Sequence, residues 1–192
     1  MPKVSDAHRR ARRDEIAEAA LRVLRRNGVA NTSIAQIVEE SGLSAGAIYA
    51  NFENKAELAR YIAQSLFDWR LQRVTEPQEA VRSPAEVVRL LLSTTTEAAP
   101  PVAVVLQFWG EAARDDELRA VLTEKVTRLR EAFAQAVLPW ARQRDPADAE
   151  ALAARTAIAM VVLCQGFLTN RALLGWTTAE DHLDAVEVMF RS

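Results

Sequence analysis

Four arginines near the start of the chain have side chains suited to binding an anionic partner: Arg9, Arg10, Arg12 and Arg13. Residues 1–26 contain eight Lys or Arg against four Asp or Glu, although the whole chain of 192 residues carries a net charge of −2. Guanidinium groups pair with nucleic-acid phosphates, and an arginine arm can also enter the minor groove of DNA. The alternative is a solvated terminus without a partner, and the residues that follow distinguish these two interpretations.

Two short helices joined by a glycine turn are predicted for residues 33–52. Ser33 and Gln36 have the spacing of a capping box, and Gly42 supplies the left-handed residue that ends a helix. Ser44 is placed to cap the second helix. Apolar residues recur on one face of each helix, at Ile34, Ile37, Val38, Ile48 and Phe52. This is the layout of a helix-turn-helix, whose second helix enters the DNA major groove.

The second of these helices has an outer face with little side-chain bulk, because Ala45, Ala47 and Ala50 fall there. Such a face can approach the floor of a DNA groove closely, but it can also serve as a contact between packed helices. Many small all-α domains contain helix–glycine–helix turns, so the motif alone leaves DNA binding and plain helical packing open. The basic segment before it favours DNA binding.

The span from Arg13 to Leu58 resembles the N-terminal domain of TetR-family transcriptional regulators. The order and spacing of the motif residues match without a gap. The matching pieces are Asn27-Gly28, Thr32-Ser33-Ile34, Gln36-Ile37, Ser41-Gly42-Leu43-Ser44, Gly46-Ala47-Ile48-Tyr49, Phe52, Asn54-Lys55 and Glu57-Leu58. The resemblance implies a three-helix DNA-binding head on a helical ligand-binding body, which acts as a homodimeric repressor.

The same resemblance implies roles for individual residues. The Tyr49 hydroxyl would contact a DNA backbone phosphate, and Lys55 would contact another at the start of the fourth helix. Thr32 or Ser33, together with the free N–H groups at the start of the second helix, would hold a third phosphate. The alternatives are a half-buried core aromatic for Tyr49 and a solvated lysine for Lys55. Base edges would face Ser44, Ala45, Gly46 and Ala47.

Two departures from the family pattern concern how the DNA sequence is read. The family often has a larger polar or basic residue at the position of Ala45, and an aromatic or histidine pair at Ala50-Asn51. The recognition helix therefore has few hydrogen-bonding groups for bases, and Ser44 and Asn51 are those that remain. We hypothesise that specificity depends more on DNA shape and on the arginine arm than on direct base contacts.

The predicted fold class is all-α, with about nine helices, because apolar residues recur at helical spacing and hairpin dipeptides are missing. A three-helix helix-turn-helix domain (1–53) would be joined by a long helix, 54–76, to a helical ligand-binding and dimerisation domain (54–192). The remaining helices are predicted at 84–99, 102–114, 116–139, 147–174 and 178–191.

The predicted helix 147–174 is apolar on nearly every side from Ala157 to Leu168. A membrane span is not favoured, because about twenty apolar residues are needed and Arg155 and Arg171 flank a shorter run. Such a helix must be covered on all sides. We predict that a second copy of the chain covers one face; a fully internal helix in a monomer is the alternative. The predicted interface residues are Ile158, Val161, Val162, Leu168, Leu183, Val186, Met189 and Phe190.

A pocket for a small-molecule effector is expected in the body on the strength of the family resemblance. Aromatic residues there are interleaved with polar ones, a mixture that suits an apolar pocket with a few orienting contacts. Each aromatic residue taken singly is more typical of a core. The candidate residues are Trp69, Thr94, Thr95, Gln107, Phe108, Trp109, Phe133, Cys164, Gln165 and Phe167.

The sequence contains no pattern that indicates a catalytic or metal-binding site. It shows no catalytic triad, paired carboxylates or phosphate-binding glycine loop, and the acidic run at 115–117 has the pattern of a helix start. His8 and His182 have no clustered partners, so we predict no catalytic residues, metal or cofactor. The single cysteine, Cys164, excludes an internal disulfide and fits a reducing cytoplasm. No signal peptide is visible, since no apolar run follows the N-terminal arginines.

Together these features predict a sequence-specific DNA-binding transcriptional regulator. We expect a ligand-responsive repressor that acts as a homodimer on a palindromic double-stranded DNA operator, in the cytoplasm and without a membrane partner. The effector, the operator sequence and the regulated genes are left open. The alternative functions are a helical protein-binding adaptor without DNA binding and, less favoured, an enzyme.

Overall fold

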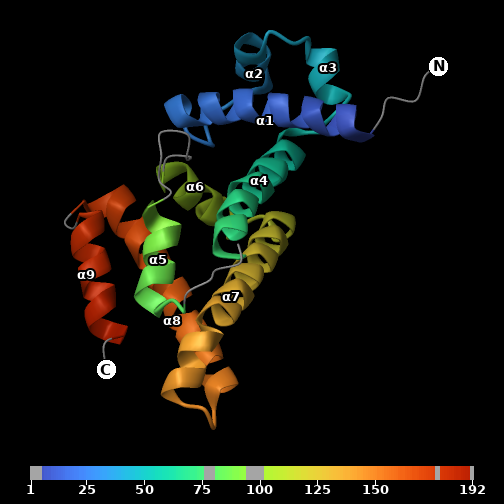
Figure 1. The fold of residues 1–192 in the computed structure, drawn as a ribbon. Helices are drawn as coiled ribbons and strands as arrows, with labels where there is room; N and C mark the ends of the chain where they lie inside the picture. Colours follow the sequence, from blue (N-terminus) through green and yellow to red (C-terminus); the bar gives the residue numbers. More distant parts are fainter. Residues whose placement is uncertain (1–5, 76–80, 94–101, 176–177, 191–192) are drawn as a thin grey trace.

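The computed structural model describes residues 6–75, 81–93, 102–175 and 178–190, without the side chains of residues 67, 69–73, 75, 93 and 179. Over these residues the chain is all-α, as predicted. The head consists of α1 (Asp6–Asn27), α2 (Ile34–Ser41) and α3 (Ala45–Tyr49). Figure 1 shows α2 above the C-terminal half of α1 and α3 above its N-terminal half.

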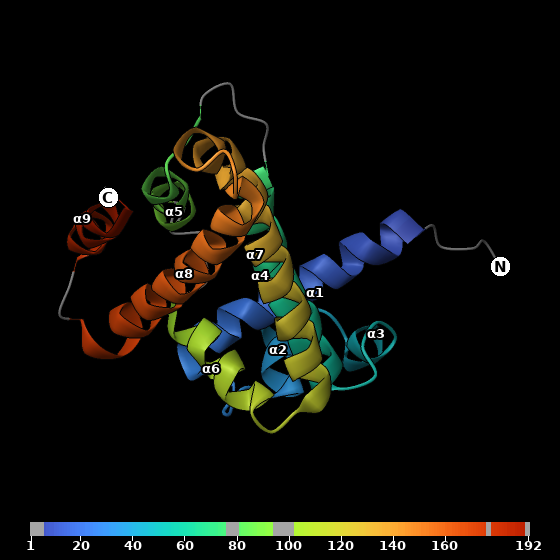
Figure 2. The same cartoon turned by 90° about the horizontal axis from the view of Figure 1, so that it is seen from below.

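The body follows the long helix α4 (Lys55–Thr75), which runs from the head to α7 (Figure 1). In the view of Figure 2, α4 and α7 lie side by side and α8 crosses them at an angle. The other body elements are α5 (Pro84–Ser93), α6 (Val102–Ala112), α7 (Asp116–Arg144), α8 (Ala149–Thr169), the π-helical turn η1 (Asn170–Leu174) and α9 (Ala179–Phe190).

Helix α7 continues past Pro139, where the sequence predicted its end. A proline inside a helix removes one backbone hydrogen bond and usually bends or ends the helix. Here Val137 and Ala141 on either side of it are fully buried, so packing against the rest of the body compensates for the lost bond. The helix ends instead at Arg144, and the N–H of the following Asp145 donates to the Ala141 carbonyl at 2.8 Å.

Buried apolar side chains form two clusters, and their division does not follow the division between head and body. One cluster joins α1, α2 and α3 to the first half of α4, to α6 and to the start of α7. The other joins α5, α8, α9 and the C-terminal part of α7. Phe108 of α6 packs in the first cluster with Ile16 of α1. The head is therefore anchored on α6 as well as on α4.

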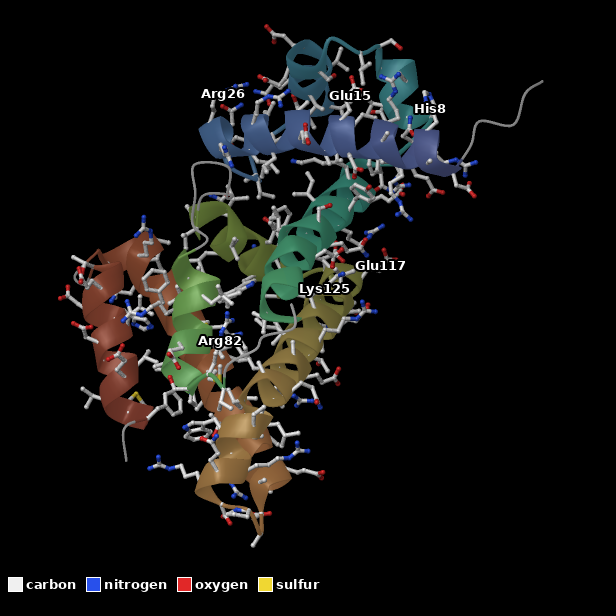
Figure 3. All side chains as sticks on the ribbon, in the orientation of Figure 1. His8, Glu15, Arg26, Arg82, Glu117 and Lys125 are labelled. Atoms are coloured by element: carbon white, nitrogen blue, oxygen red, sulfur yellow. The ribbon has the colours of Figure 1, made fainter. Side chains whose placement is uncertain are left out.

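Polar contacts also hold α4 against α7. The Lys125 ammonium group lies 2.5 Å from an Asp68 carboxylate oxygen, and the lysine side chain is only 9% exposed. Arg60 of α4 pairs with Glu117 at the start of α7, at 2.8 Å. Figure 3 shows Lys125 and Glu117 on the side of α7 that lies along α4. These pairs fix the helix that carries the head.

Candidate nucleic-acid interface

The start of α2 has the cap that the sequence predicted. The Ser33 hydroxyl accepts a hydrogen bond from the Gln36 N–H at 3.3 Å, and the Gln36 side-chain oxygen accepts from the Ser33 N–H at 2.8 Å. The N–H groups of Ile34 and Ala35, the first two residues of α2, have no acceptor within the helix and lie at the positive end of its dipole. An exposed helix start of this kind suits a DNA phosphate.

The turn between α2 and α3 has the predicted geometry. Gly42 adopts φ of 68°, and its N–H donates to the Val38 carbonyl at 3.0 Å, which ends α2. The Ser44 hydroxyl then accepts from the Ala47 N–H at 3.1 Å and caps α3. Ile48 is fully buried, so it fixes which face of α3 points outward.

The outward face of α3 is small and exposed. Ser44, Ala45 and Gly46 are exposed, and Ala47 is half-buried. Tyr49 is 54% exposed, which excludes the alternative of a core aromatic. Its hydroxyl can reach a groove wall, because Ala45 and Ala50 beside it are small as well as exposed. The arrangement presents one phenol among methyl groups.

Asn51 has a structural role that the sequence did not predict. Its side-chain nitrogen donates to the Ala47 carbonyl at 2.9 Å and so satisfies one of the last carbonyls of α3. The backbone carbonyl of Asn51 accepts a hydrogen bond from the guanidinium of Arg13 at 3.1 Å. The amide that we expected to read a base is therefore engaged inside the head.

Arg13 points inward, although it belongs to the arginine cluster that we expected to bind DNA. Besides the Asn51 carbonyl, its guanidinium binds Glu57 of α4 at 2.8 Å. It also lies over the rings of Phe52 and Tyr61, at 4.3 and 4.7 Å from their centroids. Arg13 therefore positions the end of α3 against the start of α4.

The other three arginines of the cluster face outward. Arg9 and Arg10 are exposed, while Arg12 is partly covered and pairs with Glu15 at 2.7 Å. At the opposite end of α1, both Arg22 and Arg26 bind Glu40 of α2. Their hydrogen bonds lower the pKa of the Glu40 carboxyl group. Figure 3 shows Arg26 at this far end of α1. The positive charge near the N-terminus is exposed but partly balanced, because Arg9 pairs with Asp6 at 3.9 Å and Arg12 with Glu15.

Thr32 and Lys55 both contact the turn between α1 and α2. Thr32 is 5% exposed, and its hydroxyl donates to the Gly28 carbonyl at 2.7 Å. The Lys55 ammonium group donates to the Val29 carbonyl at 3.0 Å and remains partly exposed. Thr32 is therefore a support inside the turn, and Ser33 is the more accessible of the two predicted phosphate contacts.

Glu57 and Tyr61 hold α4 against the head, a role that we did not predict. Glu57 accepts from the Glu53 N–H at 2.7 Å, and its own N–H donates to Asn54, so the two residues cap α4. The Glu53 bond, followed by the pairing with Arg13, lowers the pKa of Glu57. The Asn-x-x-Glu spacing is a capping pattern and could have identified Glu57.

Tyr61 donates a hydrogen bond to Asp14 of α1 at 2.6 Å. Burial of the Tyr61 hydroxyl, and secondly this hydrogen bond, raise the pKa of Tyr61 to about 12.

Most of the predicted pocket residues that the structure describes do not lie together around one cavity. Phe108, Phe133, Cys164 and Phe167 are buried in the apolar clusters. Gln107 faces the turn between α1 and α2 and accepts from the Val29 N–H at 2.6 Å. Thr94, Thr95 and the Trp69 side chain lie outside the described residues.

A groove of about 430 Å³ does lie between α6, α7 and α8. Of the predicted pocket residues, Trp109 and Gln165 line it. Leu122 and Val126 add apolar surface, Thr123 adds a hydroxyl, and Arg119 adds a guanidinium group. The groove therefore offers an apolar wall with a few hydrogen-bonding groups, which is the composition of a small-molecule site.

The residues predicted for a dimer interface divide into two groups. Ile158 and Val162 of α8 and Met189 of α9 are 53%, 59% and 60% exposed, respectively. The other five lie further inside: Val161, Leu183 and Val186 are buried in the core of the protomer, and Leu168 and Phe190 are partly buried. Three further exposed apolar residues were not predicted: Leu173 and Leu174 of η1 and Val188 of α9.

One helical stretch of the described chain, Ala149–Leu174, is long and apolar enough to cross a membrane by length and composition. Its inner face packs in the core of the body through Met160, Val161 and Phe167, as the core helix of a soluble protein does. We do not regard it as a convincing membrane span. Within the described residues, His, Cys, Asp and Glu form no group of three that could hold a metal ion.

Comparison with known proteins identifies the family. Residues 16–62 match the family "Bacterial regulatory proteins, tetR family", and residues 77–187 match "BetI-type transcriptional repressor, C-terminal". The chain is 31% identical over 139 residues to the uncharacterized HTH-type transcriptional regulator YfiR of Bacillus subtilis strain 168, with 70% of this chain and 67% of the relative covered. It is 30% identical over 165 residues to the HTH-type transcriptional regulator BetI of Rhizobium meliloti strain 1021, with 84% and 78% covered.

A solved structure supports the fold. A TetR transcription regulator from Haloarcula marismortui ATCC 43049 superimposes with a TM-score of 0.76 over 94% of each chain, at 18% identity. The regulators of this family are soluble DNA-binding proteins and not enzymes, so the alternatives of an enzyme and of an adaptor without DNA binding are set aside. With its intact helix-turn-helix on a helical body, the chain belongs to the TetR family and is a DNA-binding transcriptional regulator.

Proposed function

We propose that this regulator is a ligand-responsive repressor that binds a palindromic operator as a homodimer in the cytoplasm. The observation that carries the proposal is the exposed apolar face of α8 and α9, formed by Ile158, Val162, Val188 and Met189. Soluble monomers rarely expose contiguous apolar surface of this kind, and a second copy is the occupant that the body's two-helix face suits. The face belongs to the body and leaves the head open.

Dimerisation would explain why the protein recognises a palindromic DNA site. Two heads related by a two-fold axis place their recognition helices in successive major grooves when they are about 34–36 Å apart. A single α3 has few base-reading groups, so pairing two heads would also supply affinity that one head lacks. An operator of two inverted half-sites is the matching DNA.

We assign the phosphate contacts to residues that the head exposes. Ser33 and the helix start behind it would hold one phosphate, Tyr49 a second and Lys55 a third. Arg9, Arg10 and Arg12 would add a basic arm along the minor groove. The small face of α3 would lie close to the bases, with alanine methyl groups against thymine methyl groups. In this division residues 1–53 bind DNA and residues 54–192 sense the effector and dimerise.

Repression, rather than activation, is supported by the match of the body to the BetI-type transcriptional repressor C-terminal family. The groove between α6, α7 and α8 is the proposed effector site. Its composition suits a small, largely apolar molecule with one or two hydrogen-bonding groups, which would lie against Trp109 and reach Thr123 or Gln165. Effector binding would favour a spacing of the heads that no longer matches the operator.

The test is a titration of labelled DNA from upstream of the protein's own coding region, followed by fluorescence anisotropy. We expect one dimer per palindrome, much weaker binding to an isolated half-site, and light scattering that reports a dimer without DNA. Equal affinity for the half-site and the palindrome would exclude the dimeric operator complex. Increased transcription from the operator in a reporter assay would exclude repression.

A further inference from the structure

The turn between α1 and α2 is held by contacts from distant parts of the chain. It begins at Gly28, whose φ of 77° ends α1 and whose N–H donates to the Leu24 carbonyl at 2.9 Å. Thr32 closes the turn, because its hydroxyl donates to the Gly28 carbonyl at 2.7 Å. Ser33, which caps α2, follows directly. The turn therefore determines where the start of α2 lies.

Val29, at the centre of this turn, is bound on both sides by groups from other helices. Its N–H donates to the side-chain oxygen of Gln107 in α6 at 2.6 Å. Its carbonyl accepts from the ammonium group of Lys55, the first residue of α4, at 3.0 Å. Gln107 and Lys55 thus meet on one residue of the head, although they are far apart in the sequence. Figure 1 shows α6 beneath the C-terminal end of α1, next to this turn.

We propose that Gln107 is a positioning residue for DNA binding: by fixing Val29 from α6, it fixes the carbonyl that orients the phosphate-binding Lys55. The inference rests on the proposed function, in which Lys55 contacts a DNA phosphate. An ammonium group has three donors. One of them is committed to the Val29 carbonyl, so the other two are directed by it.

Holding the lysine in place in the free protein lowers the entropy that it loses when it meets the DNA. Without Gln107 the Val29 N–H loses its acceptor, the turn gains freedom, and the acceptor that orients Lys55 moves with it. The polar contact between the body and the DNA-binding surface then disappears, while the apolar contacts of Phe108 with the head remain.

The surroundings of Gln107 allow it to move. It borders a hollow of about 470 Å³ between the turn and α6, lined also by Gly110 and Glu111. A Cβ atom built on Gly28 would lie 3.1 Å from the Gln107 side-chain oxygen, so the amide is packed closely against the turn. A rotation of α6 would draw Gln107 into the hollow and release Val29.

Helix α6 also forms one wall of the groove that contains Trp109. Gln107 and Trp109 lie two positions apart and so project from different sides of α6. A molecule bound in the groove that shifts α6 therefore acts on the Val29 contact directly.

The experiment compares Gln107→Leu, which removes the acceptor at similar volume, with Gln107→Glu, which keeps an oxygen at the same reach. Lys55→Met removes the ammonium group and serves as the reference. We expect Gln107→Leu and Lys55→Met each to weaken operator binding roughly threefold to tenfold, the effect of one hydrogen bond. Each should reduce the slope of log affinity against log salt by up to about 1.8, because the dimer loses one phosphate contact, worth about 0.9, in each of its two heads. The double variant should lose little more than either single variant, and Gln107→Glu should retain the wild-type slope.

Amide hydrogen exchange of Val29, measured without DNA, tests the positioning role of Gln107 separately from the phosphate contact of Lys55. Gln107→Leu should accelerate exchange of this amide, and Gln107→Glu should not. Unchanged exchange and an unchanged salt slope in Gln107→Leu would overturn the positioning role. If Lys55→Met lowered the slope in that case, the proposed phosphate contact would still stand. If Lys55→Met left the slope unchanged, Lys55 would have no phosphate contact and the proposal would fail with it.

Discussion

Arg13 and Phe52 form a cation–π contact in which the guanidinium carbon lies 4.3 Å from the ring centroid. The contact joins α1 to the residue that follows the recognition helix. The same guanidinium binds the Asn51 carbonyl and Glu57, so one side chain fixes the angle between α1, α3 and α4. Because the side chains of Arg13 and Glu57 are each only 26% exposed, solvent screens their attraction less than it screens a surface pair.

We predict that Arg13→Leu lowers the free energy of unfolding by roughly 1–3 kcal/mol, because the head loses charged hydrogen bonds and leaves Glu57 without its partner. Arg13→Lys should recover only part of this, since an ammonium group cannot bind Asn51 and Glu57 in the same planar geometry. Arg9→Leu, at an exposed position of the same helix, is the matched control. Urea denaturation provides the measurement, and equal stability of Arg13→Leu and Arg9→Leu would contradict the internal role.

The divided behaviour of the arginine cluster shows what the sequence could and could not predict. Helix type, the caps of α2 and α3 and the glycine turn between them depend on neighbouring residues, and these were predicted. Arg13 shares a helical face with Ile16 and Ala20, both buried, so its inward direction was available from the pattern. We had assigned all four arginines one role because they share a charge.

Contacts between distant segments were not predictable in the same way. The bond between Gln107 and Val29 depends on how α6 lies against α1, which no local pattern contains. The positions of the aromatic residues in the body were also not predictable from local sequence patterns. Phe133 of the core and Trp109 of the groove have similar sequence surroundings, and only their packing distinguishes a core position from a groove wall.

Base reading by α3 is the next property open to test. Because the Asn51 amide is bound to the Ala47 carbonyl, Asn51→Ala should change base preference little on a series of altered operators. Replacing Arg9, Arg10 and Arg12 with Gln should instead reduce the salt slope by up to about 2.7 for the three charges of one head. Anisotropy titrations at several salt concentrations measure both effects. Loss of base preference in Asn51→Ala, with no effect of the arginine substitutions, would refute dependence on DNA shape and the arm.

The ion pair between Lys125 and Asp68 predicts which of two substitutions destabilises the protein more. Lys125 is almost fully buried, whereas the Asp68 side chain is 54% exposed. Asp68→Asn leaves a buried ammonium group without its counter-charge and should cost about 1–3 kcal/mol of stability, less than a fully buried pair because solvent reaches Asp68. Lys125→Met replaces the cation by an apolar group of similar length and should cost less. Thermal denaturation of the two variants checks the order, and a larger loss in Lys125→Met would contradict it.

His182 should make stability depend on pH. Burial lowers the pKa of its imidazole below the ordinary value of 6.5, and a hydrogen bond to the Leu163 backbone opposes this only in part. The ring packs on Phe167 with centroids 5.0 Å apart, and no group in the described part of the chain binds its Nε2 atom. The unfolded state therefore takes up a proton at higher pH than the folded state does.

Its contribution to stability is consequently complete above about pH 6.5 and declines as the pH falls from there toward the lowered folded-state pKa. His182→Phe should remove this part of the pH dependence, whereas His8→Phe, at an exposed position of α1, should not. Melting temperatures measured from pH 7.5 down to about pH 5 provide the comparison. If wild type and His182→Phe lost stability in parallel, the imidazole would not be the responsible group.

The apolar face of α8 and α9 yields the last prediction. Val162 is 59% exposed in the protomer, so Val162→Glu adds a charge without disturbing the core. In a dimer the same glutamate would be buried against the partner's apolar face, and we expect dimerisation to weaken about 100-fold or more, equivalent to about 3 kcal/mol.

Val81→Glu is the matched control, because Val81 is an exposed valine, at 45%, outside α8 and α9. Light scattering should report a folded monomer for Val162→Glu and a dimer for Val81→Glu, and circular dichroism should show the same helix content in both. Binding of Val162→Glu to the full palindrome should then fall toward that of an isolated half-site. If this variant remained dimeric, the copies would associate through another surface, because a buried and unpaired carboxylate in each subunit could not be tolerated at this face.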